Sequence, residues 1–312
     1  MRLAGAVAAA KRRWIGFVRP AVVVLVYHRI APRGEDPHNI VVTPGHFAEH
    51  IAVLRRWGTP MRLRDLPNVL AENRIPRRRY IITFDDGYTD NLFNAKPILE
   101  TYDTPATVFA ASAFAPGGRE CWWDMMHDLM RFTRDDQRTI ECNGKLFDVA
   151  SWNEFQTELF SMSPPHAAGV MNELFAQAGI RPKADAQSMT SDQLCNLVRC
   201  GLIDVGAHTV NHRRLAAITE AEQREEIVRS RQQLEAAIGQ PVETFAYPFG
   251  AEGTDFTETT RQLVREAGYI CACAVRPAPV TRGCNPYALP RYWVSDWNGD
   301  ELDQRLRWWS AR

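Results

Sequence analysis

Two adjacent carboxylates, Asp85 and Asp86, stand in the segment Thr83–Tyr88 (TFDDGY), directly after the apolar run Tyr80–Ile82. Successive side chains on a strand point to opposite sides, so two acids at a strand end can do different jobs. One could bind a cation while the other moves a proton. The alternative is an Asp-Asp-Gly turn on a solvated loop, because Asp and Gly form turns for reasons unrelated to catalysis. This segment alone leaves both interpretations open.

A pair of histidines four residues apart, His208 and His212, follows the apolar run Leu202–Ala207. Two imidazoles at this spacing converge in a helical turn and suit a borderline-soft divalent metal. His46 and His50 have the same spacing but lie beside the apolar stripe of an expected helix, and we expect them to be solvated. Only the first pair begins where a predicted strand ends, which favours it as a metal site.

The elements that must position these residues are βα units. Apolar, β-branched runs alternate with helical segments, a pattern that predicts a parallel sheet in an α/β fold. We expect strands at 21–27, 80–84, 106–111, 202–207, 244–247, 269–275 and 287–294. Helices are expected at 43–58, at 219–239, where Thr219 and Glu222 form a capping box, and at 257–267.

The pattern changes over 113–187, which we interpret as an inserted cap subdomain. Asn143-Gly144 predicts a hairpin, and two helical stretches follow at 151–160 and 167–178. The aromatic pair Trp122 and Trp123 lies in this insertion. The expected divisions are a basic aromatic segment at 1–20, a barrel at 21–112 and 188–296, the cap at 113–187, and a basic aromatic helix at 297–312.

Active sites of barrels and open parallel sheets form at the carboxyl ends of the strands. Four segments should therefore meet at one mouth: Tyr27–Arg29, Asp85–Gly87, His208–His212 and Tyr247–Gly250. Two histidines and one carboxylate leave metal positions open for water and substrate, as catalytic sites require.

At these segments the chain resembles the polysaccharide deacetylases of carbohydrate esterase family 4, which share the NodB-homology domain. The resemblance rests on Thr83–Tyr88 (TFDDGY), His208–His212 (HTVNH) and Phe245–Gly250 (FAYPFG), and it spans roughly 21–294 apart from the insertion. It implies a distorted (β/α)7 barrel that removes N-acetyl, occasionally O-acetyl or N-formyl, groups from sugars. Matched by position, the general base is Asp85, and the metal ligands are Asp86, His208 and His212.

Two departures from the family pattern suggest further residues. The family commonly has arginine where this chain has Ala246, so we expect Arg291, which follows a late strand, to orient Asp85; alternatively Arg291 only pairs with a surface acid. No histidine follows His212, although many members take their general acid from a late one. Segment 25–30 (LVYHRI) resembles the opening of exported poly-N-acetylglucosamine deacetylases with a permuted motif order, which makes His28 the candidate acid; alternatively it is a core histidine.

The resemblance implies metal-assisted amide hydrolysis. Tyr247 and Phe249 are expected at the oxyanion and substrate, with the backbone N–H of Phe249 facing the oxyanion. Trp122 and Trp123 could stack on sugar rings in the cap, or form the small core of the insertion. The metal is expected to be zinc, with cobalt or nickel as alternatives. The substrate would be an N-acylated amino sugar in a glycan, a glycolipid or a glycan precursor, as in exopolysaccharide or lipopolysaccharide biosynthesis.

Other functions remain as alternatives. These are a deformylase or O-deacetylase acting on a lipid-linked or nucleotide sugar, and a non-catalytic carbohydrate-binding module. A degenerate module would be expected to have lost the base or a metal ligand, and all four are present. A glycosidase built on Asp85 and Asp86 is disfavoured, because adjacent residues hardly place carboxyls roughly 5 to 9.5 Å apart across a sugar ring.

Bulk composition sets further limits. Lys plus Arg and Asp plus Glu number 37 each, so no overall field favours nucleic acid as a partner. Among seven cysteines none forms a CxxC pair, and Cys271 and Cys273 are expected to be small buried hydrophobes in a reducing compartment. The order of residues 1–13 differs from that of a secretory signal, which predicts a cytoplasmic protein. The basic aromatic ends could rest on the inner membrane face, or dock an aromatic side chain on the core.

Overall fold

The computed structural model describes residues 21–34, 36, 38–115 and 187–311, and between the last two ranges residues 139–142, 145–148, 155, 158–159, 162 and 164–179. The predicted N-terminal segment 1–20 and the pair Trp122 and Trp123 lie outside these residues. Within them, every helix is too short or too polar to cross a bilayer.

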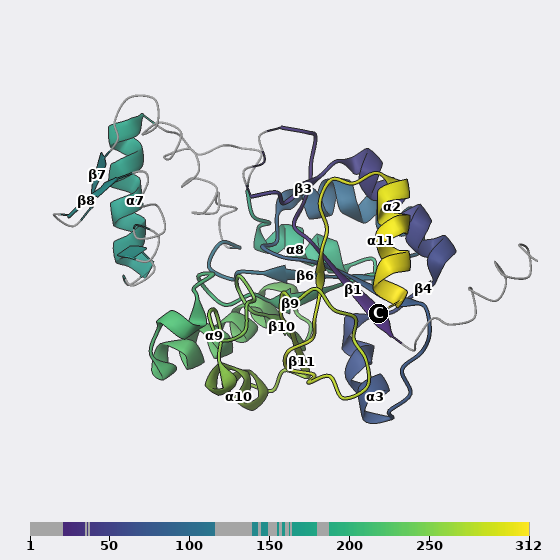
Figure 1. The fold of residues 1–312 in the computed structure, drawn as a ribbon. Coiled ribbons are helices and arrows are strands. Elements are labelled where there is room, and N and C mark those ends of the chain that lie inside the picture. The colour runs from purple at the N-terminus through teal and green to yellow at the C-terminus, as the bar shows by residue number, and fades with distance from the viewer. Residues whose placement is uncertain are drawn as a thin grey trace, which may run out of the picture.

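A parallel sheet forms the centre of the molecule (Figure 1). Its strands are β1 (Val22–Tyr27), β4 (Thr59–Pro60), β5 (Arg79–Phe84), β6 (Ala106–Ala110), β9 (Ile203–Ala207), β10 (Thr244–Ala246), β11 (Cys271–Cys273) and β12 (Tyr292–Trp293). They are arranged in the order β11-β10-β9-β6-β5-β1-β12, with β4 also pairing with β5, and every pairing is parallel. All six residues of β1 are buried, as expected for a strand covered on both faces.

The sheet curls, and one segment joins its two edges. Leu289 bridges Cys273 of β11, and Tyr292 and Trp293 of β12 then pair with β1 at the opposite edge. The expected strand 287–294 is thus reduced to a bridge and a two-residue strand, because Pro290 has no N–H to donate to a ladder. This curled parallel sheet confirms the expected distorted barrel.

Helices cover the sheet on its outside. They are α2 (Pro44–Trp57), α3 (Leu66–Ala71), α4 (Lys96–Thr101), α8 (Ser191–Val198), α9 (Glu220–Ile238), α10 (Glu258–Glu266) and α11 (Gly299–Ala311). In the view of Figure 1, α2, α8 and α11 lie above the strands, α3 and α10 below them, and α9 to their left. The predicted capping box of Thr219 and Glu222 is confirmed at the start of α9, which ends at Gly239 in a left-handed conformation.

Shorter elements complete the described chain. They are β2 (Arg29–Ile30) and β3 (Val41–Val42), which pair with each other, η1 (Leu63–Asp65), the π-helical turn η2 (Asn91–Ala95), η4 (Leu215–Ala217), and, in the insertion, β7 (Thr139–Cys142), β8 (Lys145–Asp148) and α7 (Pro164–Ala178). β7 and β8 are antiparallel and flank Asn143-Gly144, as that dipeptide predicts. They lie with α7 to the left of the barrel in Figure 1.

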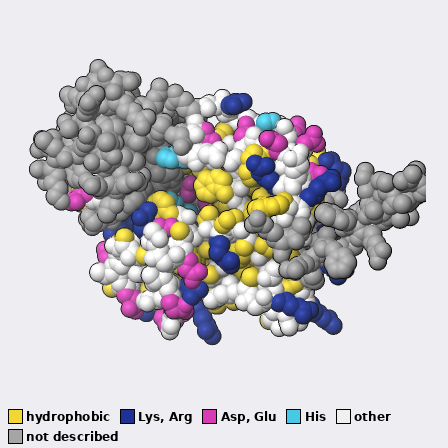
Figure 2. Space-filling model, viewed as in Figure 1, with side chains coloured by type: hydrophobic (Ala, Val, Ile, Leu, Met, Phe, Trp, Pro, Cys, Tyr) yellow, Lys and Arg dark blue, Asp and Glu magenta, His cyan; other side chains and the backbone are white. Residues whose placement is uncertain are grey.

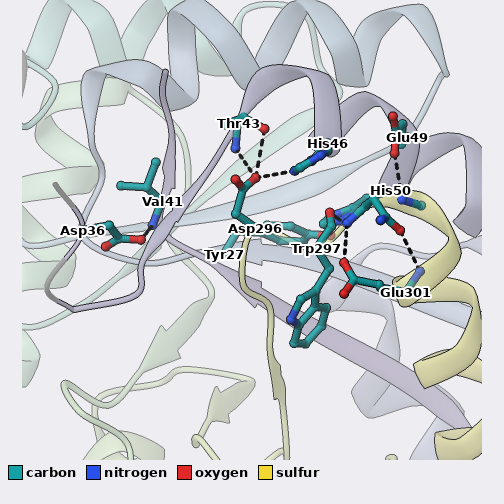
Figure 3. Close-up of polar contacts among 12 residues, drawn as sticks. Tyr27, Asp36, Val41, Thr43, His46, Glu49, His50, Asp296, Trp297 and Glu301 are labelled. Atoms are coloured by element: carbon teal, nitrogen blue, oxygen red, sulfur yellow. Dashed lines mark hydrogen bonds and ion pairs between the residues drawn. The ribbon is translucent and has the colours of Figure 1, made fainter. Parts of the chain in front are cut away.

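The C-terminal segment is fastened to α2 by polar contacts (Figure 3). Asp296 Oδ1 accepts hydrogen bonds from the backbone N–H of Thr43, at 2.8 Å, and from Nδ1 of His46, at 2.7 Å. His50 donates from Nε2 to the carbonyl oxygen of Trp297, at 2.6 Å. The expectation that His50 is solvated is wrong: the residue is fully buried, because α11 packs against the face of α2 that carries it.

The terminal helix also places one aromatic ring on the core. Trp309 stacks on Tyr292 with ring centroids 4.0 Å apart, whereas its neighbour Trp308 is 53% exposed. On the face seen in Figure 2, basic and acidic side chains are interspersed. This mixture of signs agrees with the balanced composition.

Candidate active site

The carboxyl ends of β1, β5, β9 and β10 lie at one rim because all four strands run parallel in the curled sheet, with β6 between β5 and β9. The chain turns sharply after β5, where Asp86 and Gly87 both have a φ of +70°. A side chain at Gly87 would also stand 3.0 Å from Cβ of Ala110, so glycine suits both the turn and the close approach to β6. This turn directs both aspartates into the rim.

Asp86, His208 and His212 form one buried cluster, in which their ligand atoms lie within 4.8 Å of one another. Oδ1 of Asp86 is 3.6 Å from Nε2 of His208 and 3.3 Å from Nε2 of His212. Among the described residues, this oxygen is a buried atom without a hydrogen-bond partner. A buried carboxylate oxygen facing two imidazoles is a donor set that fits a divalent cation.

The hydrogen bonding and the protonation state of both histidines suit them to bind a metal. Nδ1 of His208 donates to the carbonyl oxygen of Ala246 at 2.7 Å, which turns Nε2 toward Asp86, as is usual for histidines that bind metals. Burial lowers the pKa of His208 to about 4 and that of His212 to about 3. Both imidazoles are therefore neutral near pH 7. A neutral imidazole offers a lone pair to a metal.

Arg291 forms a bidentate ion pair with Asp85. Its Nη1 and Nη2 donate to Oδ1 and Oδ2 of Asp85 at 2.6 and 2.8 Å, and its Nε donates to the carbonyl oxygen of Ala274 at 3.1 Å. Arg291 is fully buried, so it does not pair with a surface acid. Burial alone would raise the pKa of Asp85, but Arg291 and His208 outweigh burial and lower it to about 2. Asp85 is therefore ionised throughout the neutral range.

His28 lies at the same rim, after β1, and is 8% exposed. Its ring packs on Trp293 with centroids 4.4 Å apart and planes inclined at 43°. Burial lowers the pKa of His28, while the charges of Asp86 and Asp85 act in the opposite direction. The structure thus brings His28, both aspartates, both histidines and Arg291 together.

A polar network that the sequence did not predict supports His28. Asp90 accepts hydrogen bonds from Nε of Arg29, at 3.0 Å, and from the backbone N–H of Ile30, at 2.9 Å. Nδ2 of Asn91 donates to the carbonyl oxygen of His28 at 2.7 Å. The only signal in the sequence is an Asp-Asn pair shortly after the two aspartates, which equally suits a helix cap.

The segment after β10 contributes one of its two aromatic rings. Phe249 is 38% exposed, has a φ of +63°, and its ring lies 5.0 Å from that of His212. The side chain of Tyr247 does not reach the rim, contrary to expectation. Its ring stacks on Phe256 at 3.7 Å, and its hydroxyl donates to the carbonyl oxygen of Tyr287.

Comparison with known proteins gives a consistent picture. A sequence model of the polysaccharide deacetylase family matches residues 72–142 and 164–272. YxkH of Bacillus subtilis (strain 168), assigned by name to the polysaccharide deacetylases, is 23% identical over 288 residues, which are 90% of this chain and 75% of YxkH.

Solved structures resemble this fold over nearly its whole length. IcaB from Ammonifex degensii has a TM-score of 0.61 and 19% identity, with 94% of this chain and 97% of IcaB covered. The Streptococcus pyogenes deacetylase PplD, solved in complex with acetate, has a TM-score of 0.60 and 18% identity, with 91% and 97% covered. The family model matches more than half of the 312 residues of this chain. The chain therefore belongs to the polysaccharide deacetylase family and is a carbohydrate deacetylase.

Proposed function

We propose that this deacetylase is a metal-dependent hydrolase that removes the N-acetyl group of an amino sugar in a glycan, a glycolipid or a glycan precursor. The observation that carries the proposal is the buried cluster of Asp86, His208 and His212 beside an ionised Asp85 that Arg291 holds in place. The acetate in the PplD structure supports acetyl as the acyl group that is removed.

Each side chain has a role in this proposal. Asp86, His208 and His212 would hold the cation, with zinc as the first choice and cobalt or nickel as alternatives. A bound divalent ion would lower the pKa of water and polarise the acyl carbonyl. Asp85 accepts the proton of the attacking water, and Arg291 fixes the orientation of its carboxylate.

The second half of the reaction needs a proton donor and an oxyanion partner. His28 donates a proton to the departing amine, so that acetate and a free amino group result. The backbone N–H of Phe249 donates to the oxyanion, while its partly exposed ring packs beside His212. The ring of Trp293 packs on that of His28 and so restricts how the imidazole can turn.

The proposal is tested by product release. Zinc-loaded protein is incubated with a glucosamine oligomer, a nucleotide sugar and a lipid-linked sugar, each in N-acetyl, N-formyl and O-acetyl form, and both acetate and formate are measured. We expect acetate from at least one of them, and a loss of about 10²-fold or more in Asp85→Asn. Formate in place of acetate would favour the deformylase alternative, and acetate from an ester alone would favour the O-deacetylase. No release from any of them would disprove the hydrolase as written.

The place of action is a separate proposal. We infer a substrate at the inner membrane face, supported by the exposed Trp308 of α11, with Arg305 and Arg307 in the same helix. Co-sedimentation of the full chain with anionic vesicles, compared with Trp308→Ser, tests it. If both proteins bind the vesicles equally, Trp308 of α11 does not contribute to membrane binding.

A further inference from the structure

The loop that carries both histidines has an unusual backbone. Thr209 has a φ of +63° and His212 a φ of +55°, and neither residue is glycine. A left-handed backbone is unfavourable for residues other than glycine, and such conformations persist only where the surroundings hold them. The imidazole directions depend on this backbone, so what holds the loop also holds the metal ligands.

One side of the loop is held by the chain that follows β6. The backbone N–H of Ser112 donates to the carbonyl oxygen of Thr209 at 3.1 Å, and that of Ala113 donates to the carbonyl oxygen of Val210 at 2.9 Å. These two bonds use loop carbonyls only. The N–H groups on the other side of the loop need acceptors of their own.

Glu226 of α9 supplies those acceptors. Its Oε2 accepts hydrogen bonds from the backbone N–H groups of Val210, at 2.8 Å, and Asn211, at 2.9 Å, and its Oε1 accepts one from Nδ2 of Asn211, at 2.7 Å. Glu226 is 5% exposed. A carboxylate is suited to this position because both of its oxygens only accept.

The helix that carries Glu226 is itself fixed near the site. The hydroxyl of Tyr269 donates to the carbonyl oxygen of Ile227 in α9 at 3.1 Å. Further along α9, Oε1 of Gln233 accepts from the hydroxyl of Ser112 at 2.6 Å. Helix α9 therefore contacts both the histidine loop and the segment that holds the loop from the other side.

We propose that Glu226 is a positioning residue for the metal site, which fixes the His208–His212 loop in the backbone conformation that points both imidazoles at Asp86. This inference rests on the proposed metal-dependent function. Groups that orient metal ligands typically change metal affinity by 10- to 100-fold when they are removed. A purely structural role would instead lower the stability of the fold and leave the affinity of the folded protein unchanged.

The experiment compares full-length variants. Zn²⁺ affinity is measured by calorimetric titration of the metal-free protein, and Co²⁺ absorption bands report the geometry of the ligands. Glu226→Ala should bind Zn²⁺ about 10- to 100-fold more weakly and show altered Co²⁺ bands. Glu226→Gln should recover most of the affinity, because its oxygen still accepts from the two backbone N–H groups and the amide of Asn211 can turn to accept from its nitrogen.

The matched control is Ser230→Ala. Ser230 is a fully buried polar residue of the same helix, and its hydroxyl contacts Ile227 and Tyr269 rather than the loop. This variant should lose stability but keep the wild-type Zn²⁺ affinity. If Glu226→Ala does not fold, Asn211→Ala, which removes only the bond to Oε1, should still weaken Zn²⁺ binding.

The outcomes separate the inference from the proposed function. Wild-type affinity in folded Glu226→Ala, or in Asn211→Ala where the former does not fold, would overturn the positioning role. An equal loss in Ser230→Ala would also overturn it, because the effect would then belong to helix packing. If the wild type itself binds neither Zn²⁺ nor Co²⁺, or Asp86→Ala binds them equally well, the metal site of the proposed function fails and this inference fails with it.

Discussion

At the scale of single residues, the ion pair between Arg291 and Asp85 governs the protonation of the proposed base. Both side chains are buried, and the pKa of Asp85 is about 2 because the cationic neighbours outweigh the effect of burial. Without the guanidinium, only His208 and His28 would oppose the effect of burial, and the pKa of Asp85 should rise. A base of this kind is lost when it becomes protonated, so Arg291 should determine the acidic limit of activity.

We therefore expect Arg291→Met to lower kcat by about 10²-fold, since the carboxylate loses its fixed orientation. The acidic limb of the pH profile of kcat/KM should move to higher pH, because Asp85 then gains a proton as the pH falls. Breaking a buried pair should also lower the free energy of unfolding by about 3 to 5 kcal/mol. The measurements are a pH–rate profile and denaturant unfolding.

The control for this variant is Arg62→Met. Arg62 pairs with Asp204, at 3.1 Å, where β9 begins and hence at the opposite end of the strands. Its loss should reduce stability but leave the pH profile unchanged. An unshifted acidic limb in Arg291→Met would contradict the assignment of Asp85 as the base.

At the scale of the elements, the contact between α2 and α11 contains a buried titratable group. His50 is fully buried between the hydroxyl of Tyr27 and the carbonyl oxygen of Trp297, and burial lowers its pKa to about 4. In the unfolded chain its pKa is close to the ordinary 6.5. The unfolded state therefore takes up a proton between these two pH values while the folded state does not.

It follows that the stability from His50 is fully present above about pH 6.5 and is lost as the pH falls toward about 4, by up to roughly 3 kcal/mol. The free energy of unfolding of the metal-free protein, measured by denaturant titration at several pH values, should fall more steeply in the wild type than in His50→Gln. His208 and His212 contribute with the same sign in both proteins. Parallel slopes in the two proteins would contradict the prediction.

The turn after β10 requires glycine at position 250. Gly250 has a φ of +81°, and a Cβ there would lie 2.7 Å from the backbone nitrogen of Val275. Gly239, which ends α9, has a φ of +67° with nothing within 4 Å of such a Cβ. Gly239→Ala should thus cost about 1 kcal/mol, from backbone conformation alone.

Gly250→Ala should cost more, roughly 3 kcal/mol, because the backbone around Val275 must also move. It should also reduce kcat, since Phe249 is the preceding residue. Thermal unfolding and steady-state kinetics of the two variants check both points. Equal destabilisation by the two substitutions would show that the turn can relax around the added methyl group.

At the scale of the whole molecule, the sequence predicted what local patterns determine and missed what distant segments impose. Strand ends and the capping box of Thr219 and Glu222 follow from local chemistry, and the strand ends alone were sufficient to predict that Asp86, His208 and His212 meet at one rim. The burial of His50 depends on α11, some 250 residues later in the chain.

The same limit applies to the residues around Asp85 and Tyr247. Arg291 contacts Asp85 because the short segment that contains Pro290 joins β11 to β1 and so closes the curled sheet. The sequence pattern does not predict this closure. The position of Tyr247 in a motif predicts that it lies at the mouth, but the direction of a side chain depends on register as well as position. A sequence pattern therefore predicts well which strand ends meet at a rim. It predicts less well which side chains point into that rim.

The arrangement of the strands also predicts how a metal would stabilise the whole protein. Asp86 follows β5, and His208 and His212 follow β9, with β6 lying between these two strands in the sheet. A cation held by all three would tie together parts of the barrel that are far apart in the sequence, and the unfolded chain could not form this site. At a Zn²⁺ concentration about 100-fold above Kd, mass action predicts about 2.7 kcal/mol of stabilisation.

That gain should raise Tm by roughly 5 °C, at the low end of the range for larger domains, and EDTA should reverse it. Differential scanning calorimetry with and without Zn²⁺ measures the shift. Asp86→Ala removes the carboxylate that faces both imidazoles, so the shift should disappear in this variant even if its metal-free Tm changes. If Zn²⁺ raised the Tm of Asp86→Ala by the same amount, the ion would bind elsewhere on the protein. The stabilisation by Zn²⁺ would then not come from a cation at this rim.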